Sequence, residues 1–219
     1  MSPSRPRQWR RRRGYHHGNL REVLIEAARQ LIEKRGPEGF TLTEAARLAG
    51  VSVAAPYRHF KDREALLAAV ARTGFDRFAD RLEEAWADGE PSAIAAFEAM
   101  GRAYLQFARE EPASYAAMFE TELPAALHPE LAAASDRAFD ILERACERLC
   151  QNLPEEMRPP RALMSMHVWA LTHGIATLFA KGKPTSGKVP LSAEEVLETG
   201  SLIYLIGLGL LPQSGAPTK

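Results

Sequence analysis

Residues 41–60, TLTEAARLAGVSVAAPYRHF, contain two short helical patterns separated by a glycine, and they decide how the rest of the chain is interpreted. Thr41 and Glu44 have the spacing of a capping box, in which a hydroxyl and a carboxylate each satisfy a free backbone amide at a helix start. Gly50 is expected to end this first helix, because glycine adopts the left-handed backbone conformation at little cost. Ser52 is then placed to cap a second helix.

The second pattern, from Val53 to about Phe60, makes this stretch a predicted helix-turn-helix. In that motif a short turn joins two helices, and the second helix enters the major groove of DNA. An earlier helix, expected over 20–35, has an apolar stripe that would pack behind the motif and complete a three-helix bundle. The side chains expected to fill the middle of the bundle are Phe40, Leu48, Val51 and Phe60.

Composition indicates an all-helical protein. Alanine, leucine, glutamate and arginine are plentiful and β-branched runs are scarce, which favours helices. No apolar run reaches the roughly 18–20 residues that span a bilayer, so no membrane contact is expected; the best candidate, 202–211, predicts a buried helix. Cys146 and Cys150 fit a reducing, cytoplasmic compartment. They are interpreted as core residues, since a metal would need further ligands and none is close in the sequence.

The formal net charge of zero hides a marked asymmetry. Residues 1–81 carry 17 basic and 9 acidic side chains, whereas residues 82–219 carry 11 and 19. The basic part includes the predicted helix-turn-helix, so a polyanion is the expected partner there. Residues 1–14 form an arm without an apolar face, expected to be disordered. Its run of Arg10, Arg11, Arg12 and Arg13 suits DNA phosphates or a narrow minor groove, with a solvated tail as the alternative.

Caps and proline-containing breaks predict about nine helices in all. Beyond the bundle they are expected over 63 to the mid-80s, 92–109, 113–120, 129–151, 161–180 and 192–212. The last of these is apolar around much of its circumference and must be buried on several sides. The last two long helices therefore predict a homodimer interface of four helices, two from each chain. Burial within the monomer is the alternative.

The segment GFTLTEAARLAGVSVAAPYRHFKDREALL, residues 39–67, resembles the N-terminal motif of the TetR family of transcriptional regulators in register. GYHHGNLREVLI, residues 14–25, and Trp169 with His173-Gly174 resemble one subgroup of that family, whose C-terminal domain has a Trp-His-Gly patch. The resemblance implies a DNA-binding domain over 15–65, an effector-binding and dimerisation domain over 66–212, and a disordered tail over 213–219.

The resemblance also implies which side chains contact DNA. Those matching base-facing or groove-facing positions are Thr43, Val53, Ala54, Ala55 and Tyr57, and those matching phosphate-binding positions are Thr41, His59 and Arg63, with Ser52 and Lys61 beside them. The chain departs from the commoner pattern at residues 53–56, which lack a bidentate hydrogen-bonding side chain and include a proline. Specificity is therefore expected to depend on few direct base contacts, with Thr43, Tyr57, the arm and DNA shape adding the rest.

No enzyme activity, cofactor or metal is expected, because the chain lacks a glycine-rich phosphate loop, a nucleophile elbow and an HExxH motif. The leading hypothesis is a homodimeric repressor of a near-palindromic operator, released by a small apolar or aromatic effector. The candidate pocket residues are Phe78, Trp86, Phe97, Met100, Tyr104, Tyr115, Met118, Phe119, Trp169 and His173. Each of them, taken singly, fits an ordinary core position as well.

Three alternatives remain open at this point. A DNA-binding regulator without a small-molecule effector, controlled by abundance or a protein partner, would have a fully packed C-terminal core. A helical enzyme with an appended DNA-binding motif would need titratable groups converging on one cavity. A non-specific nucleic-acid binder would have equal affinity for any duplex at fixed salt concentration.

Overall fold

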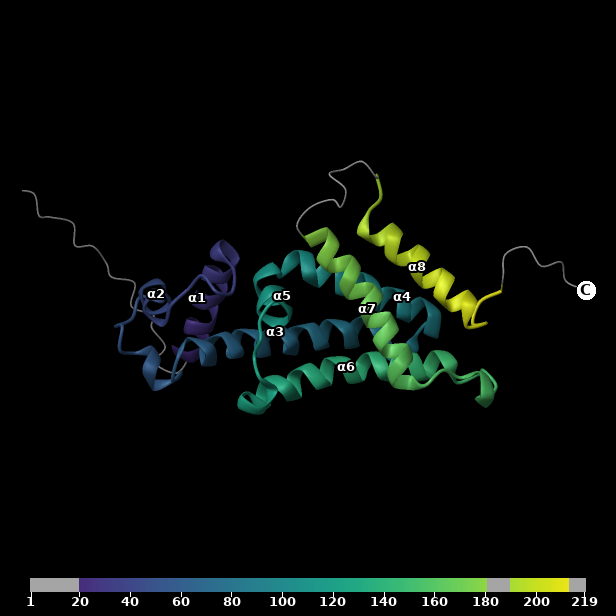
Figure 1. Cartoon of the computed structure of the whole chain (residues 1–219), viewed down its shortest axis with the longest axis horizontal. Helices are drawn as coiled ribbons and strands as arrows, with labels where there is room; N and C mark the ends of the chain where they lie inside the picture. The colour runs from purple at the N-terminus through teal and green to yellow at the C-terminus, as the bar shows by residue number, and fades with distance from the viewer. Residues whose placement is uncertain (1–19, 181–189, 213–219) are drawn as a thin grey trace, which may run out of the picture.

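The computed structural model describes residues 20–180 and 190–212, and within them the chain forms eight α-helices and no β-strand (Figure 1). The all-helical prediction is confirmed. The helices are α1 (Leu20–Arg35), α2 (Leu42–Leu48), α3 (Arg63–Trp86), α4 (Ala93–Glu110), α5 (Pro112–Phe119), α6 (Pro129–Cys150), α7 (Arg161–Ala180) and α8 (Ala193–Gly207). The expected arm over 1–14 and tail over 213–219 lie outside the described residues.

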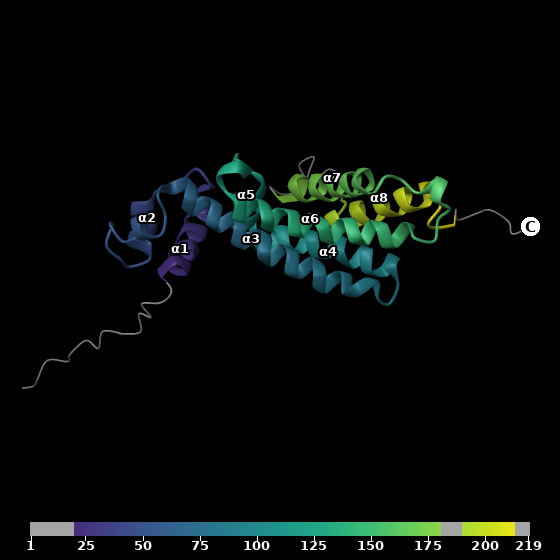
Figure 2. The ribbon, with the colours of Figure 1, turned by 90° about the horizontal axis from the view of Figure 1, so that it is seen from below.

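The helix α3 is the axis around which the other helices are arranged (Figures 1 and 2). Asp62 caps it by accepting a hydrogen bond from the backbone N–H of Ala65 at 2.8 Å. At 1.5 Å per residue it is about 36 Å long. The helix α1 lies near its first turns, and α4, α5 and α6 pack along the rest. The expected domain boundary at residue 65 falls within α3, so one continuous helix belongs to both units.

The first helix of the predicted motif, α2, forms as expected. The N–H of Glu44 donates to Thr41 Oγ1 at 3.2 Å, and the N–H of Thr41 donates to Glu44 Oε2 at 3.0 Å, which completes the capping box. Gly50 has the left-handed φ of 71° that the turn requires. Phe40 and Phe60 are buried as predicted, but Leu48 is 46% exposed. The reason is that position 48 lies off the buried stripe of α2.

The second helix of the motif, expected from Val53 to about Phe60, is not an α-helix. Only Pro56–Arg58 is helical, as a single 3-10 turn. Proline has no amide hydrogen, so Pro56 cannot donate to the carbonyl of Ser52 as an α-helix would require. The N–H of Ala55 donates to that carbonyl instead, at 3.0 Å. Ser52 therefore begins the turn through its backbone, rather than as the side-chain cap of a longer helix.

The short helix α5 packs against both α1 and α3, and Gly74 makes room for it. This glycine is buried within the continuous helix α3. A Cβ atom at Gly74 would lie 2.8 Å from Met118 Sδ and 3.3 Å from Ser114 Cβ. The glycine therefore allows α5 to approach α3 closely.

The helix α7 has the predicted bounds, whereas α8 is shorter than predicted. The capping box of Ser192 and Glu195 forms at the start of α8. The helix ends at Gly207 rather than Pro212, and Gly209 takes a left-handed φ of 75° in the turn that follows. Large apolar side chains remain exposed on both helices, namely Leu163, Met166, Leu178, Leu202 and Ile203.

One described stretch, residues 155–180, is long and apolar enough by length and composition to cross a membrane, which the sequence pattern did not single out. Most of it is α7, which packs against α4, α6 and α8 in this structure. Cys146 and Cys150 are buried, as predicted. Folding brings Met164 Sδ to 3.4 Å from Cys150 Sγ. Burial raises the pKa of Cys146 to about 11.

We expect Gly74→Ala to lower the free energy of unfolding by about 1–3 kcal/mol, because the added methyl group overpacks the contact with α5. Gly174→Ala in α7 is the matched control, since its Cβ would meet no atom within 4 Å. That variant should gain up to about 1 kcal/mol from helix propensity. Urea denaturation measures both. Equal stabilisation of the two variants would contradict the close approach of α5 at Gly74.

Candidate functional site

The connection between α2 and α3, residues 49–62, presents most of the side chains predicted to contact DNA. Ser52, Val53, Ala54, Tyr57, His59 and Lys61 are exposed there, and Ala55 is half-buried. Pro56 is buried and fixes the turn, while the neighbouring Tyr57 is 60% exposed. The candidate Arg10, Arg11, Arg12 and Arg13 lie outside the described residues.

The two candidate threonines lie at the start of α2. Thr41 is exposed, but its hydroxyl already takes part in the capping box and also donates to Glu44 Oε2 at 3.0 Å. Arg35 donates to the same carboxylate at 2.7 Å, and the hydrogen bonds from Arg35 and Thr41 lower the pKa of Glu44. Thr43 is half-buried, and no side-chain hydrogen bond engages its hydroxyl within the described part of the chain.

Arg63 is turned toward the protein rather than toward solvent. Its guanidinium donates to the carbonyl oxygens of Phe40, at 3.0 Å, and of Pro37, and it lies over the Phe40 ring with 5.0 Å to the centroid. The Arg63 side chain is 30% exposed, compared with 67% for Lys61. Arg63 therefore holds the loop before α2 against the start of α3. Its predicted phosphate contact would come in addition to that structural role.

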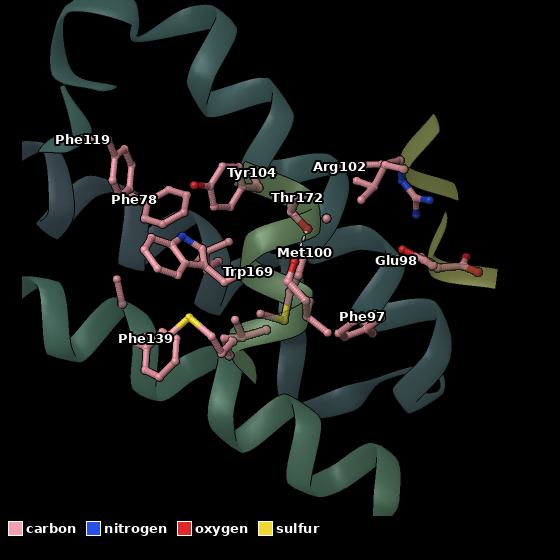
Figure 3. Close-up of a pocket in the computed structure, with 18 of the residues that line it drawn as sticks. Phe78, Phe97, Glu98, Met100, Arg102, Tyr104, Phe119, Phe139, Trp169 and Thr172 are labelled. Carbon is pink, nitrogen blue, oxygen red and sulfur yellow. Dashed lines mark hydrogen bonds between the residues drawn. The ribbon is translucent and has the colours of Figure 1, made fainter. Parts of the chain in front are cut away.

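A cavity of about 280 Å³ lies among α3, α4, α6, α7 and α8, with Phe119 of α5 at its wall (Figure 3). Six of the candidate pocket residues line it: Phe78, Phe97, Met100, Tyr104, Phe119 and Trp169. Figure 3 shows Phe119, Phe78, Tyr104 and Trp169 grouped at one end, with Glu98 and Arg102 apart from them. The cavity thus has an aromatic interior and a charged rim.

The other four candidates lie outside the cavity lining. Trp86 is buried at the end of α3, beside Gly89. Met118 packs on Gly74. Tyr115 and His173 form a polar cluster behind Tyr104. Aromatic character alone therefore did not distinguish a cavity wall from ordinary core.

Sequence reasoning missed several lining residues, among them Phe75, Phe139, Thr172, Glu98 and Arg102. Phe139 lies on the inward face of a helix and could have been included with the other aromatic candidates. The charged residues carry no such signal, because their place at the rim depends on how α4, α6 and α8 come together.

The polar cluster joins α4, α5 and α7. The hydroxyl oxygens of Tyr104 and Tyr115 each lie 2.9 Å from His173 Nδ1, and the Tyr115 hydroxyl lies 3.3 Å from Thr177 Oγ1. Burial lowers the pKa of His173 and strongly raises that of Tyr104, so the imidazole and the phenol are both neutral near pH 7. In the neutral tautomer with its proton on Nε2, Nδ1 has one lone pair, so it accepts a hydrogen bond from one tyrosine at a time.

The helix α5 connects the cavity wall to the N-terminal helices. Phe119 lines the cavity and Tyr115 contacts His173, whereas Ser114 and Met118 lie against α3 at Gly74. Arg77 of α3 donates to Ser114 Oγ at 2.9 Å and to Glu111 Oε2 at 3.0 Å. A second connection is made by the start of α6. There His128 Nε2 lies 2.9 Å from Glu64 Oε1, in the first turn of α3. Contacts at the cavity are therefore linked to the segment beside the α2–α3 connection.

An all-helical fold that joins an exposed helix-turn-helix corner to an aromatic cavity is typical of helical DNA-binding regulators. Family models match both parts of the chain: bacterial regulatory proteins of the tetR family over residues 24–70, and the tetracyclin repressor-like C-terminal domain over residues 97–200. The chain belongs to the TetR family of bacterial transcriptional regulators, which bind DNA.

Individual relatives agree with this assignment. A protein with unknown function from Rhodococcus sp. RHA1 is 34% identical, with a TM-score of 0.74 over 89% of this chain and 98% of that one. The TetR family transcriptional regulator PfmR from Thermus thermophilus shares the fold, with a TM-score of 0.63 over 84% of this chain and 97% of that one, at 22% identity. The HTH-type transcriptional repressor AcnR of Corynebacterium efficiens is 35% identical over 66 residues, which is 30% of this chain and 35% of that protein.

Lys61→Ala and Arg63→Ala should separate DNA contact from structural support. We expect Lys61→Ala to weaken DNA binding and lower the slope of log affinity against log salt by about one unit, with stability changed by less than about 0.5 kcal/mol. Arg63→Ala should cost about 1–3 kcal/mol of stability, because it leaves two carbonyl groups without their donor. Fluorescence anisotropy and urea denaturation provide the two measurements. An Arg63→Ala protein of unchanged stability would contradict the anchoring role.

Proposed function

We propose that this protein is a homodimeric transcriptional repressor that binds a near-palindromic operator and is released from it by a small apolar or aromatic effector. The observation that carries the proposal is the shared helix α3. Phe75, Phe78 and Leu82 of this helix line the cavity, and its N-terminal residue directly follows the α2–α3 connection. A molecule in the cavity would therefore act on the helix that supports the DNA-contacting segment.

The proposed mechanism is a population shift between two positions of that segment. An effector that binds one conformer more tightly raises the population of that conformer. If that conformer has the wrong spacing between the two half-site contacts, DNA affinity falls. Coupling of about 1–3 kcal/mol is ordinary for such systems. The contacts of α5 with α1 and of His128 with Glu64 are the physical connections through which the shift would pass.

Two copies would dock in successive major grooves, roughly 34–36 Å apart. Each copy offers few hydrogen-bonding groups to the bases. Thr43 has an available hydroxyl, Tyr57 projects a ring and a hydroxyl, and the small side chains of Val53 and Ala54 permit close approach and apolar contact with thymine methyl groups. DNA shape and the arginine arm would supply the remaining specificity.

The exposed apolar side chains of α7 and α8 support a dimer through these two helices. Ile203 is 66% exposed and Leu178 is 64% exposed, which is costly for a monomer when such side chains gather on one surface. A second copy packed on this surface would bury them in a four-helix arrangement. In that case the apolar composition of residues 155–180 reflects burial in a protein interface, rather than in a membrane. A cytoplasmic location is consistent with that role.

The alternative, a regulator without a small-molecule effector, would be favoured by a fully packed C-terminal core. The aromatic cavity favours the effector-released repressor over it.

The proposal is tested by selecting duplexes from random DNA with the purified protein and then measuring their release by candidate compounds. Selection should recover inverted repeats with half-sites about one helical turn apart. Recovery of unrelated sequences with equal affinities would favour a non-specific binder. An inverted repeat that no compound releases would favour the alternative without an effector.

Deletion of residues 10–13 should lower operator affinity and reduce the salt slope by up to about four units, one for each phosphate that these arginines neutralise. The arm lacks apolar residues at the deleted positions, so the melting temperature should not change. Operator binding at several salt concentrations measures the effect. An unchanged affinity and salt slope would show that the arm does not contact DNA.

Ile203→Arg should convert the dimer to monomers, because it places a charge in the apolar interface. Analytical ultracentrifugation measures the mass, and circular dichroism checks that the helices remain. Arg102→Ala is the control, since this residue lies at the cavity rim. Dimers that persist at micromolar concentration in Ile203→Arg would rule out the α7–α8 interface.

A further inference from the structure

We propose that the cavity selects a lipophilic cation: an aromatic or apolar body that carries one positively charged group, such as an amine. This inference rests on the proposed effector role of the cavity and names the chemical class of its ligand. The charges that line the cavity, their partners and their positions support it.

Figure 3 groups Phe119, Phe78, Tyr104 and Trp169 at one end of the cavity, with Glu98 and Arg102 away from them. Two hydroxyls of the lining are already engaged: Thr172 Oγ1 donates to the Val168 carbonyl at 2.9 Å, and the Tyr104 hydroxyl lies 2.9 Å from His173 Nδ1. The surrounding rings of Phe78, Phe119 and Trp169 present π-electron faces, which attract cations and repel anions. A carboxylate at this end would therefore be desolvated without a compensating charge.

The rim is acidic. Three carboxylates line it, Glu98 of α4, Asp136 of α6 and Glu198 of α8, against the single guanidinium of Arg102. All four side chains are exposed, so they lie where the cavity meets solvent. Arg102 Nη1 lies 3.8 Å from Glu198 Oε1, so the one positive group already has a carboxylate beside it.

Glu98 and Asp136 form no ion pair or side-chain hydrogen bond within the described part of the chain. Glu98 lies one helical turn from Arg102 on α4, and Figure 3 shows both at the end of the cavity away from the aromatic group. A ligand whose body lies among the aromatic rings would thus hold a terminal ammonium near the unpaired Glu98, and Asp136 adds a second unpaired carboxylate to the lining. An anionic group would be repelled by both carboxylates.

Because the rim carboxylates are exposed, their effect on affinity should be moderate and sensitive to salt. We expect a cation to bind roughly tenfold more tightly than a neutral ligand of the same shape, and a carboxylate to bind more weakly than the neutral ligand. Raising the salt concentration should reduce these differences without abolishing the binding of the neutral ligand, which depends on apolar burial.

The test uses three probes with one aromatic body: naphthylethylamine, naphthylethanol and naphthylacetate. Isothermal titration calorimetry measures their affinities for the full-length protein, and fluorescence anisotropy measures operator release. The variant Glu98→Gln/Asp136→Asn should reduce the preference for the amine about three- to tenfold and leave the alcohol unchanged. Glu156→Gln, which removes an equally exposed carboxylate outside the lining, is the matched control and should have no effect.

A further variant tests whether the three probes bind inside this cavity. Ala138→Phe fills part of the lining, so it should weaken all three probes together, with a thermal melt to confirm folding. If that variant does not fold, loss of the amine preference in Glu98→Gln/Asp136→Asn places the amine at the cavity, because both side chains line it.

Three results would overturn the inference in distinguishable ways. Equal binding of amine and alcohol, or tightest binding of the carboxylate, with the operator still released, would contradict the charge preference and leave the effector-released repressor standing. A preference for the amine that survives Glu98→Gln/Asp136→Asn would show that the rim does not cause it. If no probe binds, both the ligand class and the effector role of this cavity fail.

Discussion

The packing of α4 and α5 on the middle of α3 is the constraint on which the rest of this structure depends. The Phe78 ring lies 4.9 Å from Tyr104 and 5.0 Å from Phe107, measured between ring centroids. Such aromatic pairs contribute about 0.5–1.5 kcal/mol each beyond the burial of their area. Phe78 also lines the cavity. The same ring therefore packs α3 against α4 and lines the cavity, so the proposed effector would contact α3 directly.

Local sequence features predicted much of the fold. The features that they did not predict depend on contacts between segments that are distant in the sequence. Caps such as Asp62, together with glycine and proline breaks, placed most helices within a few residues. Pro56 then shortened the second motif helix, because the loss of one backbone donor outweighed a helical apolar pattern. Gly74 lies inside α3 and is the contact site for α5. Such contacts join distant segments, so no local pattern reveals them.

The two candidate sites also differ in how far the sequence alone could predict their residues. Apart from the arginine arm, the residues predicted to contact DNA lie within residues 41–63, so one motif could propose them together, although it could not show that Arg63 also anchors the Phe40 loop. The cavity is assembled from six helices. Aromatic content suggested Phe78 and Trp169 but gave no means of separating them from Trp86, which is ordinary core. An unfilled apolar cavity lowers the stability of the fold. Such a loss of stability is expected where a cavity is kept for binding.

The central claim is that occupation of the cavity moves the DNA-contacting segments of a dimer through α3. It is tested most directly by attaching a spin label at Ala54→Cys and measuring the label-to-label distance across the dimer by pulsed electron resonance. Labelling can be selective, since Cys146 and Cys150 are buried. Without ligand, the distances should include one compatible with grooves roughly 34–36 Å apart. A ligand that releases the operator should shift the population away from it. Release of the operator with an unchanged distance distribution would contradict the claim.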